Sequence, residues 1–125
     1  MTGTSRMADS RRMTGKLGED RAARYLTESL GYRVLCRNYR TPDGEIDIIA
    51  LDRDVLVFVE VRTTRDPGLG HASITPKKKQ KMCKVALKYL ENLKRDYQRL
   101  RFDAVFVEKE PAEGLEHVEN IIMLA

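Results

Sequence analysis

The sequence lacks long apolar segments, and this excludes several classes of protein. No apolar run in the 125 residues approaches the roughly 20 residues that a membrane-spanning helix needs, so we expect no membrane partner. Residues 1–13 contain no apolar core of a secretory signal, and their Ser, Thr and Arg content predicts a flexible tail. We therefore expect a cytoplasmic protein in which residues 14–125 form a single domain.

Cysteine is scarce as well, which excludes a disulfide-stabilised fold and a cysteine-based zinc site. The two cysteines, Cys36 and Cys83, are too few for a disulfide framework. No CxxC pair and no cluster of Cys and His accompanies them. Both lie in apolar segments, so we expect them to be small core residues.

The remaining apolar pattern predicts an α/β fold with the element order α-β-β-β-α-β-β. Apolar residues at helical spacing predict a first helix over residues 14–30, and Gly31 stands where a C-terminal cap glycine belongs. Thr75 and Pro76 begin a second helix that we expect to reach Arg95. We expect strands over residues 32–39, 45–51, 55–62, 101–108 and 116–124. A central mixed sheet flanked by the two helices is the natural packing of this order.

Positive charge is concentrated in the second helix and in the segment after it. Residues 77–101 hold ten Lys and Arg against two acids, whereas the whole chain has a net charge of only +4. Four of these lysines recur at helical spacing and form one stripe: Lys77, Lys81, Lys84 and Lys88. Such a stripe on an otherwise acidic protein predicts a nucleic-acid-binding surface. A solvated helix face is the alternative.

Two acids interrupt the apolar strands expected over residues 45–51 and 55–62. Burying Asp47 or Glu60 without a partner would be costly, so their positions need an explanation. In a hairpin that turns near residue 53, both carboxylates lie at similar heights near the open end, and Arg62 follows Glu60 on the same strand face. If the two side chains lie on the same face of the hairpin, the carboxylates of Asp47 and Glu60 converge.

A third acid, Glu19, is the first member of the apolar stripe of the first helix, so it should also point toward the sheet. Carboxylates that are forced together raise one another's pKa, and a hard divalent cation such as Mg²⁺ removes that penalty. The spacing is thus compatible with a metal site made by Glu19, Asp47 and Glu60. It is equally compatible with a structural salt bridge from Arg62 to Asp47 or Glu60.

Several motifs occur in the order found in a known family. The segments GKLGEDRAARYL, GEIDIIA, VFVEVRTT, ITPKKKQKM and RFDAVFV resemble those of the YraN-like family of small bacterial proteins, and the resemblance covers residues 14–108. That family is similar to the PD-(D/E)xK nuclease superfamily. The resemblance implies a restriction-endonuclease-like fold, which is an α/β domain with a central mixed β-sheet flanked by helices.

The resemblance also implies a role for each matching residue. Asp47 matches the metal-binding aspartate of the superfamily, Glu60 matches the glutamate of its ExK element, and Glu19 matches an acid that can join the metal site. Arg62 stands where the lysine would be; because arginine stays protonated, it can hold a phosphate but cannot act as a general base. Gln80 falls in the second helix, where the superfamily often has a supporting polar residue.

These observations leave two functions open. The first is an Mg²⁺- or Mn²⁺-dependent DNA endonuclease that acts on branched or flapped DNA, as Holliday-junction resolvases do; the two-fold symmetry of a junction would then imply a homodimer. The second is a non-catalytic nucleic-acid-binding module on an inherited nuclease fold. Only the first needs Asp47 and Glu60 to hold a cation.

Overall fold

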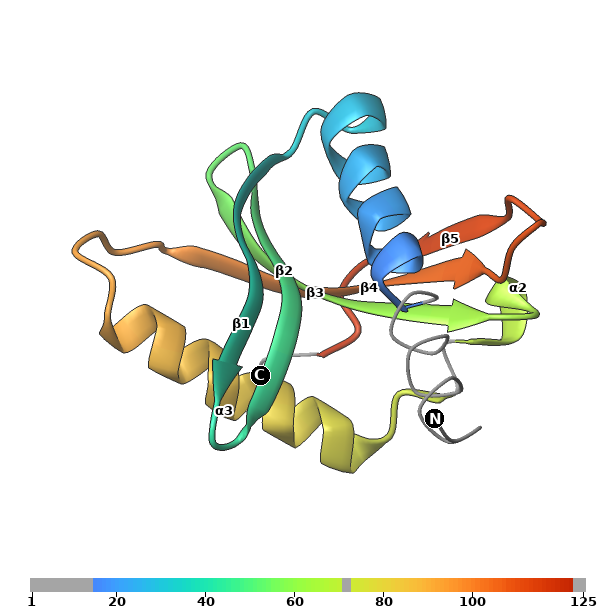
Figure 1. The fold of residues 1–125 in the computed structure, drawn as a ribbon. Helices are drawn as coiled ribbons and strands as arrows, with labels where there is room; N and C mark the ends of the chain where they lie inside the picture. The colour runs from blue at the N-terminus through green and yellow to red at the C-terminus, as the bar shows by residue number, and fades with distance from the viewer. Residues whose placement is uncertain (1–14, 71–72, 123–125) are drawn as a thin grey trace, which may run out of the picture.

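A computed structural model describes residues 15–70 and 73–122 of the chain, which form a sheet with helices on both of its faces (Figure 1). The tail expected over residues 1–13 lies outside the described residues. Within the described ranges, no helix is both long and apolar enough to cross a membrane.

Five strands form one mixed sheet in the order β1-β2-β3-β4-β5 (Figure 1). Neighbouring strands are antiparallel except β3 and β4, which are parallel. The strands are β1 (Arg33–Thr41), β2 (Gly44–Asp52), β3 (Val55–Thr64), β4 (Arg99–Glu108) and β5 (Leu115–Val118). The predicted mixed sheet is therefore confirmed, and the parallel pair is joined by a crossover that contains the second long helix.

The first helix occupies residues 15–24 and widens into the π-helical segment η1 (Tyr25–Ser29). Gly31 ends it as predicted. Its φ of +72° is a left-handed conformation that glycine adopts without strain, and its N–H donates to the carbonyl of Thr27 over 3.1 Å. The chain can therefore leave the helix sharply and enter β1.

Two helices lie in the crossover between β3 and β4. The short helix α2 (Pro67–Gly70) comes first, and α3 (Pro76–Glu91) begins at the predicted Thr75 cap. The end of α3 was predicted wrongly, since the helix stops before Asn92 and does not reach Arg95. Asn92 turns its side-chain amide back onto the helix, where it donates to the last turn and competes with further helical hydrogen bonds.

The last strand is also shorter than predicted, because β5 ends at Val118 and does not reach residue 124. Asn120 adopts a left-handed φ of +62°, and its N–H donates to Asp103 Oδ1 over 3.1 Å. A buried carboxylate on β4 thus takes the chain out of the ladder.

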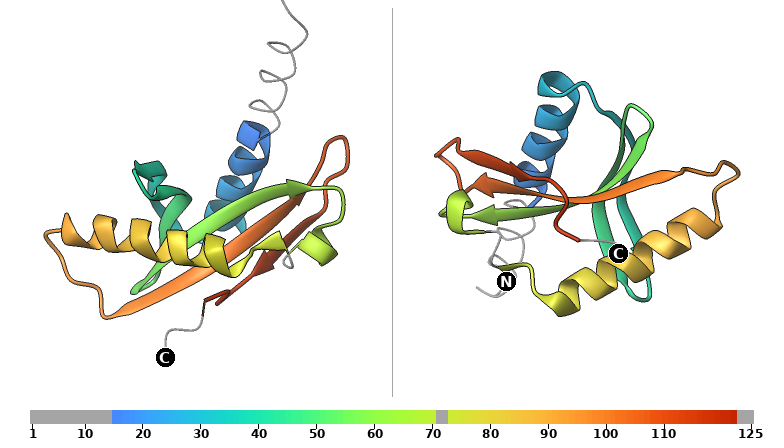
Figure 2. Two further views of the ribbon diagram at one scale, coloured as in Figure 1. Left: turned by 90° about the horizontal axis from the view of Figure 1, so that it is seen from below. Right: turned by 180° about the vertical axis from the view of Figure 1, so that it is seen from behind.

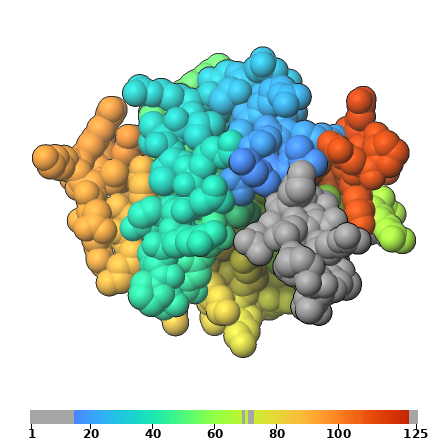
Figure 3. Space-filling model, viewed as in Figure 1, coloured from blue at the N-terminus to red at the C-terminus, as the bar shows by residue number. Residues whose placement is uncertain are grey.

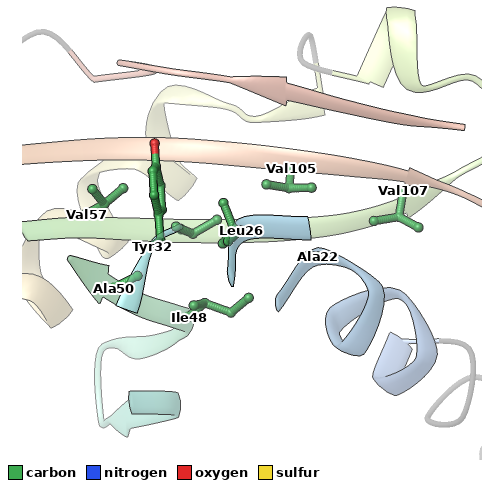
Figure 4. Packing of buried hydrophobic residues seen from close by; sticks show 9 residues of the cluster. Ala22, Leu26, Tyr32, Ile48, Ala50, Val57, Val105 and Val107 are labelled. Atoms are coloured by element: carbon green, nitrogen blue, oxygen red, sulfur yellow. The ribbon is translucent and has the colours of Figure 1, made fainter. Parts of the chain in front are cut away.

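The first helix and α3 cover opposite faces of the sheet (Figures 1 and 2). Apolar side chains are buried on both faces, as expected for a sheet flanked by two helices. The cluster on the side of the first helix consists of Ala22, Leu26, Tyr32, Ile48, Ala50, Val57, Val59, Val105 and Val107 (Figure 4). The cluster on the side of α3 consists of Ile46, Ile49, Leu56, Phe58, Met82, Val85, Ala86 and Phe102. On the surface, β1 and β2 lie between the first helix and α3 (Figure 3).

The sheet divides at one end of the β2–β3 pair. The β2–β3 ladder ends at the pair formed by Ile48 and Val59. Beyond this pair β2 continues beside β1 and β3 continues beside β4, so the two halves of the sheet diverge (Figure 1). Asp47 and Glu60 are the first residues past the last paired position. The two acids therefore occupy the point where the sheet opens.

Candidate functional site

Asp47 and Glu60 are brought together at the divergence of β2 and β3. Asp47 Oδ2 accepts a hydrogen bond of 2.8 Å from the backbone N–H of Val61, so a carboxylate replaces the missing ladder partner of that N–H. The side chain of Asp47 also shares a hydrogen bond with that of Glu60, which is only 6% exposed. Two carboxyl groups in contact can share a proton or hold a cation between them.

The surroundings of Asp47 favour its protonated form. Burial and the negative charge of Glu60 raise the pKa of Asp47 from 3.8 to about 8, with a further contribution from Glu19 and an opposing one from the Val61 N–H. At neutral pH the pair therefore retains a proton that two exposed carboxyl groups would have lost. A divalent cation that bound both side chains would displace this proton, and oxygen ligands of this kind are the ones that hard cations prefer. The donor set thus fits Mg²⁺ or Mn²⁺.

Lys78 also belongs to this site, although the sequence analysis did not single it out. Its Nζ lies 3.1 Å from Glu60 Oε2, and the two side chains are 32% and 8% exposed. A signal for this placement exists in the sequence, because Lys78 is at helical spacing with Met82 and Val85, which pack against the sheet. Lys78 is therefore the N-terminal member of the apolar face of α3 and not part of its exposed stripe.

Arg62 makes no ion pair with a carboxylate in the described part of the chain; the cation beside Glu60 is Lys78. The Nε of Arg62 is buried and has no hydrogen-bond partner among the described residues. A buried donor without a partner costs free energy, so such groups are uncommon in stable folds. The unpaired Nε of Arg62 is therefore an uncommon feature of this end of β3.

Glu19 turns toward β1 and not into the contact between Asp47 and Glu60. Its Oε1 accepts hydrogen bonds of 3.1 and 2.9 Å from Arg37, and its Oε2 accepts one of 2.9 Å from Asn38. Asn38 adopts a left-handed φ of +54° within β1, an uncommon conformation for a residue other than glycine. Glu19 acts on Asp47 through its charge, while its own oxygens are already occupied.

The predicted lysine stripe lies on the exposed side of α3, and Gln80 is exposed beside it. All four stripe residues are exposed: Lys77, Lys81, Lys84 and Lys88. The first turn of α3 contains no acid, although positive charge at the N-terminus of a helix is unfavourable. The composition of this turn therefore lowers helix stability, and a bound anion would relieve the repulsion.

A second group of potential metal ligands lies on the other face of the sheet. Asp103, His117 and Glu119 offer ligand atoms within 4.8 Å of one another. Asp103 is fully buried and accepts hydrogen bonds from Arg101, from His117 and from the N–H of Asn120. Arg101 also lies 3.6 Å from Glu119. Its guanidinium already supplies the positive charge that a metal ion would bring, so we interpret this group as a structural ion-pair network.

Comparisons with known proteins identify the family. The model of a family described as "Uncharacterised protein family UPF0102" matches residues 18–107. A UPF0102 protein of Syntrophus aciditrophicus is 47% identical over 116 residues, which are 90% of each chain, and one of Pelotomaculum thermopropionicum is 44% identical over 119 residues, 91% of this chain and 98% of its own.

Among solved structures, SfsA of Pyrococcus furiosus in complex with Ca²⁺ aligns with a TM-score of 0.30 and 14% identity, over 87% of this chain and 63% of that protein. That likeness is too weak to carry an argument about fold or function. The family match and the curated relatives each extend over most of the chain. The chain therefore belongs to the uncharacterised protein family UPF0102, which confirms the family predicted from its YraN-like motifs.

Proposed function

We propose that this protein is a divalent-cation-dependent DNA endonuclease of the PD-(D/E)xK type, in which Asp47 and Glu60 hold Mg²⁺ or Mn²⁺. The observation that carries the proposal is the contact between the buried Glu60 and the partly buried Asp47 where β2 and β3 diverge, with the pKa of Asp47 raised to about 8. Such an arrangement destabilises the ion-free fold and is typical of sites shaped for chemistry.

Each residue of the site has a distinct task in this proposal. A bound Mg²⁺ would polarise a phosphate and lower the pKa of a coordinated water. Asp47 and Glu60 supply the anionic oxygens, and the Val61 N–H fixes the orientation of the Asp47 carboxylate. Arg62 lies two residues beyond Glu60, and its partly exposed guanidinium makes no ion pair with a carboxylate of the described residues, so we assign the substrate phosphate to it. Glu19 adds negative potential from outside the Asp47–Glu60 contact.

Cleavage of DNA tests the proposal directly. We expect the purified protein to cut branched or flapped DNA in Mg²⁺ or Mn²⁺ and to be inactive in EDTA. Glu60→Gln preserves the size of the side chain but removes its charge, and it should lower the rate by about 100-fold or more, because a metal ligand contributes several kcal/mol to the transition state. The rates should be measured on labelled branched, single-stranded and duplex substrates.

Two further variants sharpen this assay. Arg62→Ala should bind Mn²⁺ like the wild type and lose cleavage, whereas Glu113→Gln changes an exposed acid on the β4–β5 connection and should keep full activity. Cleavage that survives Glu60→Gln would show that the activity does not come from this site.

The second candidate function is a non-catalytic nucleic-acid-binding module on a nuclease-like fold. The ion pair between Lys78 and Glu60 favours it, since this contact neutralises one of the two acids without a metal ion. An arginine in place of the expected lysine at position 62 favours it as well. DNA binding without cleavage on any substrate, with Mn²⁺ bound, would support this second function.

Either function uses the lysine stripe for sequence-independent contacts to phosphates. Lys81→Ala and Lys84→Ala should each reduce the slope of log affinity for DNA against log salt concentration by about 1, because each removes one phosphate contact. Lys109→Ala removes the same charge from the end of β4, away from α3, and should leave the slope unchanged. The slopes can be measured by fluorescence anisotropy from low to physiological salt. Unchanged slopes in the two α3 variants would mean that the stripe is only a solvated face.

A further inference from the structure

We propose that Lys78 couples cation binding to phosphate binding: its ammonium neutralises Glu60 in the ion-free protein and moves to a DNA phosphate when a divalent cation takes its place. This inference rests on the proposed function and extends it, because it gives the site a residue that binds substrate only when the cation is present. Lys78 would thereby supply the lysine that position 62 lacks.

The ion-free half of this exchange is visible in the structure. Lys78 Nζ is 3.1 Å from an oxygen of Glu60, and Glu60 is the less exposed partner of the pair. The backbone of Lys78 is fixed, because its N–H donates to the Thr75 cap over 3.1 Å. The ammonium, in contrast, sits at the end of a flexible four-carbon chain. The head group can therefore change partner while the helix stays in place.

Electrostatics predict that the ammonium leaves when a cation arrives. A divalent ion held by Asp47 and Glu60 would occupy the space beside the same carboxylate, and like charges at such short range repel strongly where water is largely excluded. Lys77 and Lys79 and the N-terminus of α3 add positive potential to this turn. The displaced ammonium thus needs a new anion.

A DNA phosphate is the anion that the surroundings favour. The partly exposed Arg62 follows Glu60 by two residues on β3, while Lys78 approaches Glu60 from α3. A phosphate oxygen at the site would therefore find donors on β3 and on α3, and both are charged. Charge-assisted hydrogen bonds of this kind are among the stronger polar contacts in proteins.

The test compares Lys78→Met with Lys77→Met, which removes the same charge from the neighbouring, exposed position of α3. Affinity for a labelled branched DNA is measured in EDTA and in Ca²⁺, which binds oxygen ligands and serves here as the probe cation. In EDTA, Lys78→Met should bind DNA within about twofold of wild type, because Glu60 already holds the ammonium. In Ca²⁺ it should bind about tenfold more weakly than wild type, as expected for the loss of a charge-assisted contact. Lys77→Met should lose the same factor in both conditions.

Calorimetry with Mn²⁺ gives a second readout that does not depend on DNA. Lys78→Met should bind Mn²⁺ several-fold more tightly than wild type, since the ion no longer competes with the ammonium, and Lys77→Met should match wild type. If Lys78→Met behaves like Lys77→Met in either measurement, the coupling proposed for Lys78 is wrong even when Mn²⁺ binds wild type through Asp47. If wild type binds no Mn²⁺ at all, the proposed function fails and this inference fails with it.

Discussion

Asp47→Asn should lose Mn²⁺ binding and at the same time stabilise the ion-free protein at alkaline pH. Asparagine keeps the oxygen that accepts the Val61 N–H, so the backbone at the divergence of β2 and β3 stays in place. It cannot supply the charge that a divalent cation needs. We expect the affinity for Mn²⁺ to fall by about 100-fold or more, as is typical when the ligand shell of a metal is disrupted.

The stability effect follows from the raised pKa of Asp47. The folded protein holds this proton up to about pH 8, whereas the unfolded chain releases it near the ordinary value of 3.8. The ion-free wild type should therefore lose stability as the pH rises from 3.8 toward 8, and Asp47→Asn should not. A tenfold change in proton affinity is worth about 1.4 kcal/mol, so the variant should be more stable than wild type at pH 8 by about 2 kcal/mol or more.

Urea denaturation at several pH values, with and without Mn²⁺, measures both effects. For wild type below pH 8, each increase of one pH unit should raise the affinity for Mn²⁺ by about tenfold, because binding displaces one proton. Asp54→Asn is the matched control, since Asp54 lies in the turn of the same hairpin and its side chain is 72% exposed. An Asp47→Asn variant that is less stable than wild type at pH 8 would contradict the raised pKa.

Asp103→Ala should be the most destabilising single change at a polar residue. Asp103 is fully buried and is held by Arg101, by His117 and by the N–H of Asn120. Removing one partner of a buried ion pair leaves the other uncompensated, which typically costs about 3–5 kcal/mol. For a domain of this size, that loss should lower Tm by about 12–20 °C.

The pH dependence of this loss has the opposite sign to that of Asp47. Burial alone would raise the pKa of Asp103, yet the hydrogen bonds from His117, Arg101 and Asn120 lower it. Its contribution is therefore present above about pH 4 and is lost as the pH falls further, so wild type and variant should converge in acid. Thermal denaturation from pH 3 to 8 measures this convergence.

Two other substitutions serve as controls for Asp103→Ala. Glu119→Ala removes a more exposed acid of the same network and should cost less than about 1 kcal/mol. Asp103→Asn retains part of the hydrogen bonding and should lie between Asp103→Ala and wild type. If Asp103→Ala and Glu119→Ala shift Tm equally, the buried network does not stabilise the fold as proposed.

The acids of the candidate site could be predicted from the sequence because the information that places them is local. Asp47 and Glu60 belong to one hairpin, so strand alternation and the position of the turn predicted that they lie at similar heights and converge if their faces match. The direction of Glu19 toward the sheet followed from the apolar stripe of its helix. Its partners did not, because Arg37 and Asn38 approach it from β1, whose register shifts between Val34 and Cys36.

Lys78 and Asp103 show where such reasoning stops. Lys78 lies within a run of three lysines, so its charge does not distinguish it from its neighbours, and only its helical spacing with the apolar face of α3 does. Asp103 is a single acid within a predicted strand, and no nearby pattern in the sequence predicts its contact with His117, which lies 14 residues later. Contacts between β4 and β5 depend on how the chain packs, and an alternating pattern cannot specify them.

The divergence of β2 and β3 also affects how the sheet can deform. In a continuous ladder, two neighbouring strands can move apart only if backbone hydrogen bonds break. Beyond Ile48 and Val59, the link between the two halves that the structure shows at Asp47 is a hydrogen bond from the Val61 N–H to a side chain, which can rotate. The distance between the carboxyl groups of Asp47 and Glu60 can therefore change without breaking a backbone–backbone hydrogen bond of the sheet. It can adjust to a bound group without local unfolding.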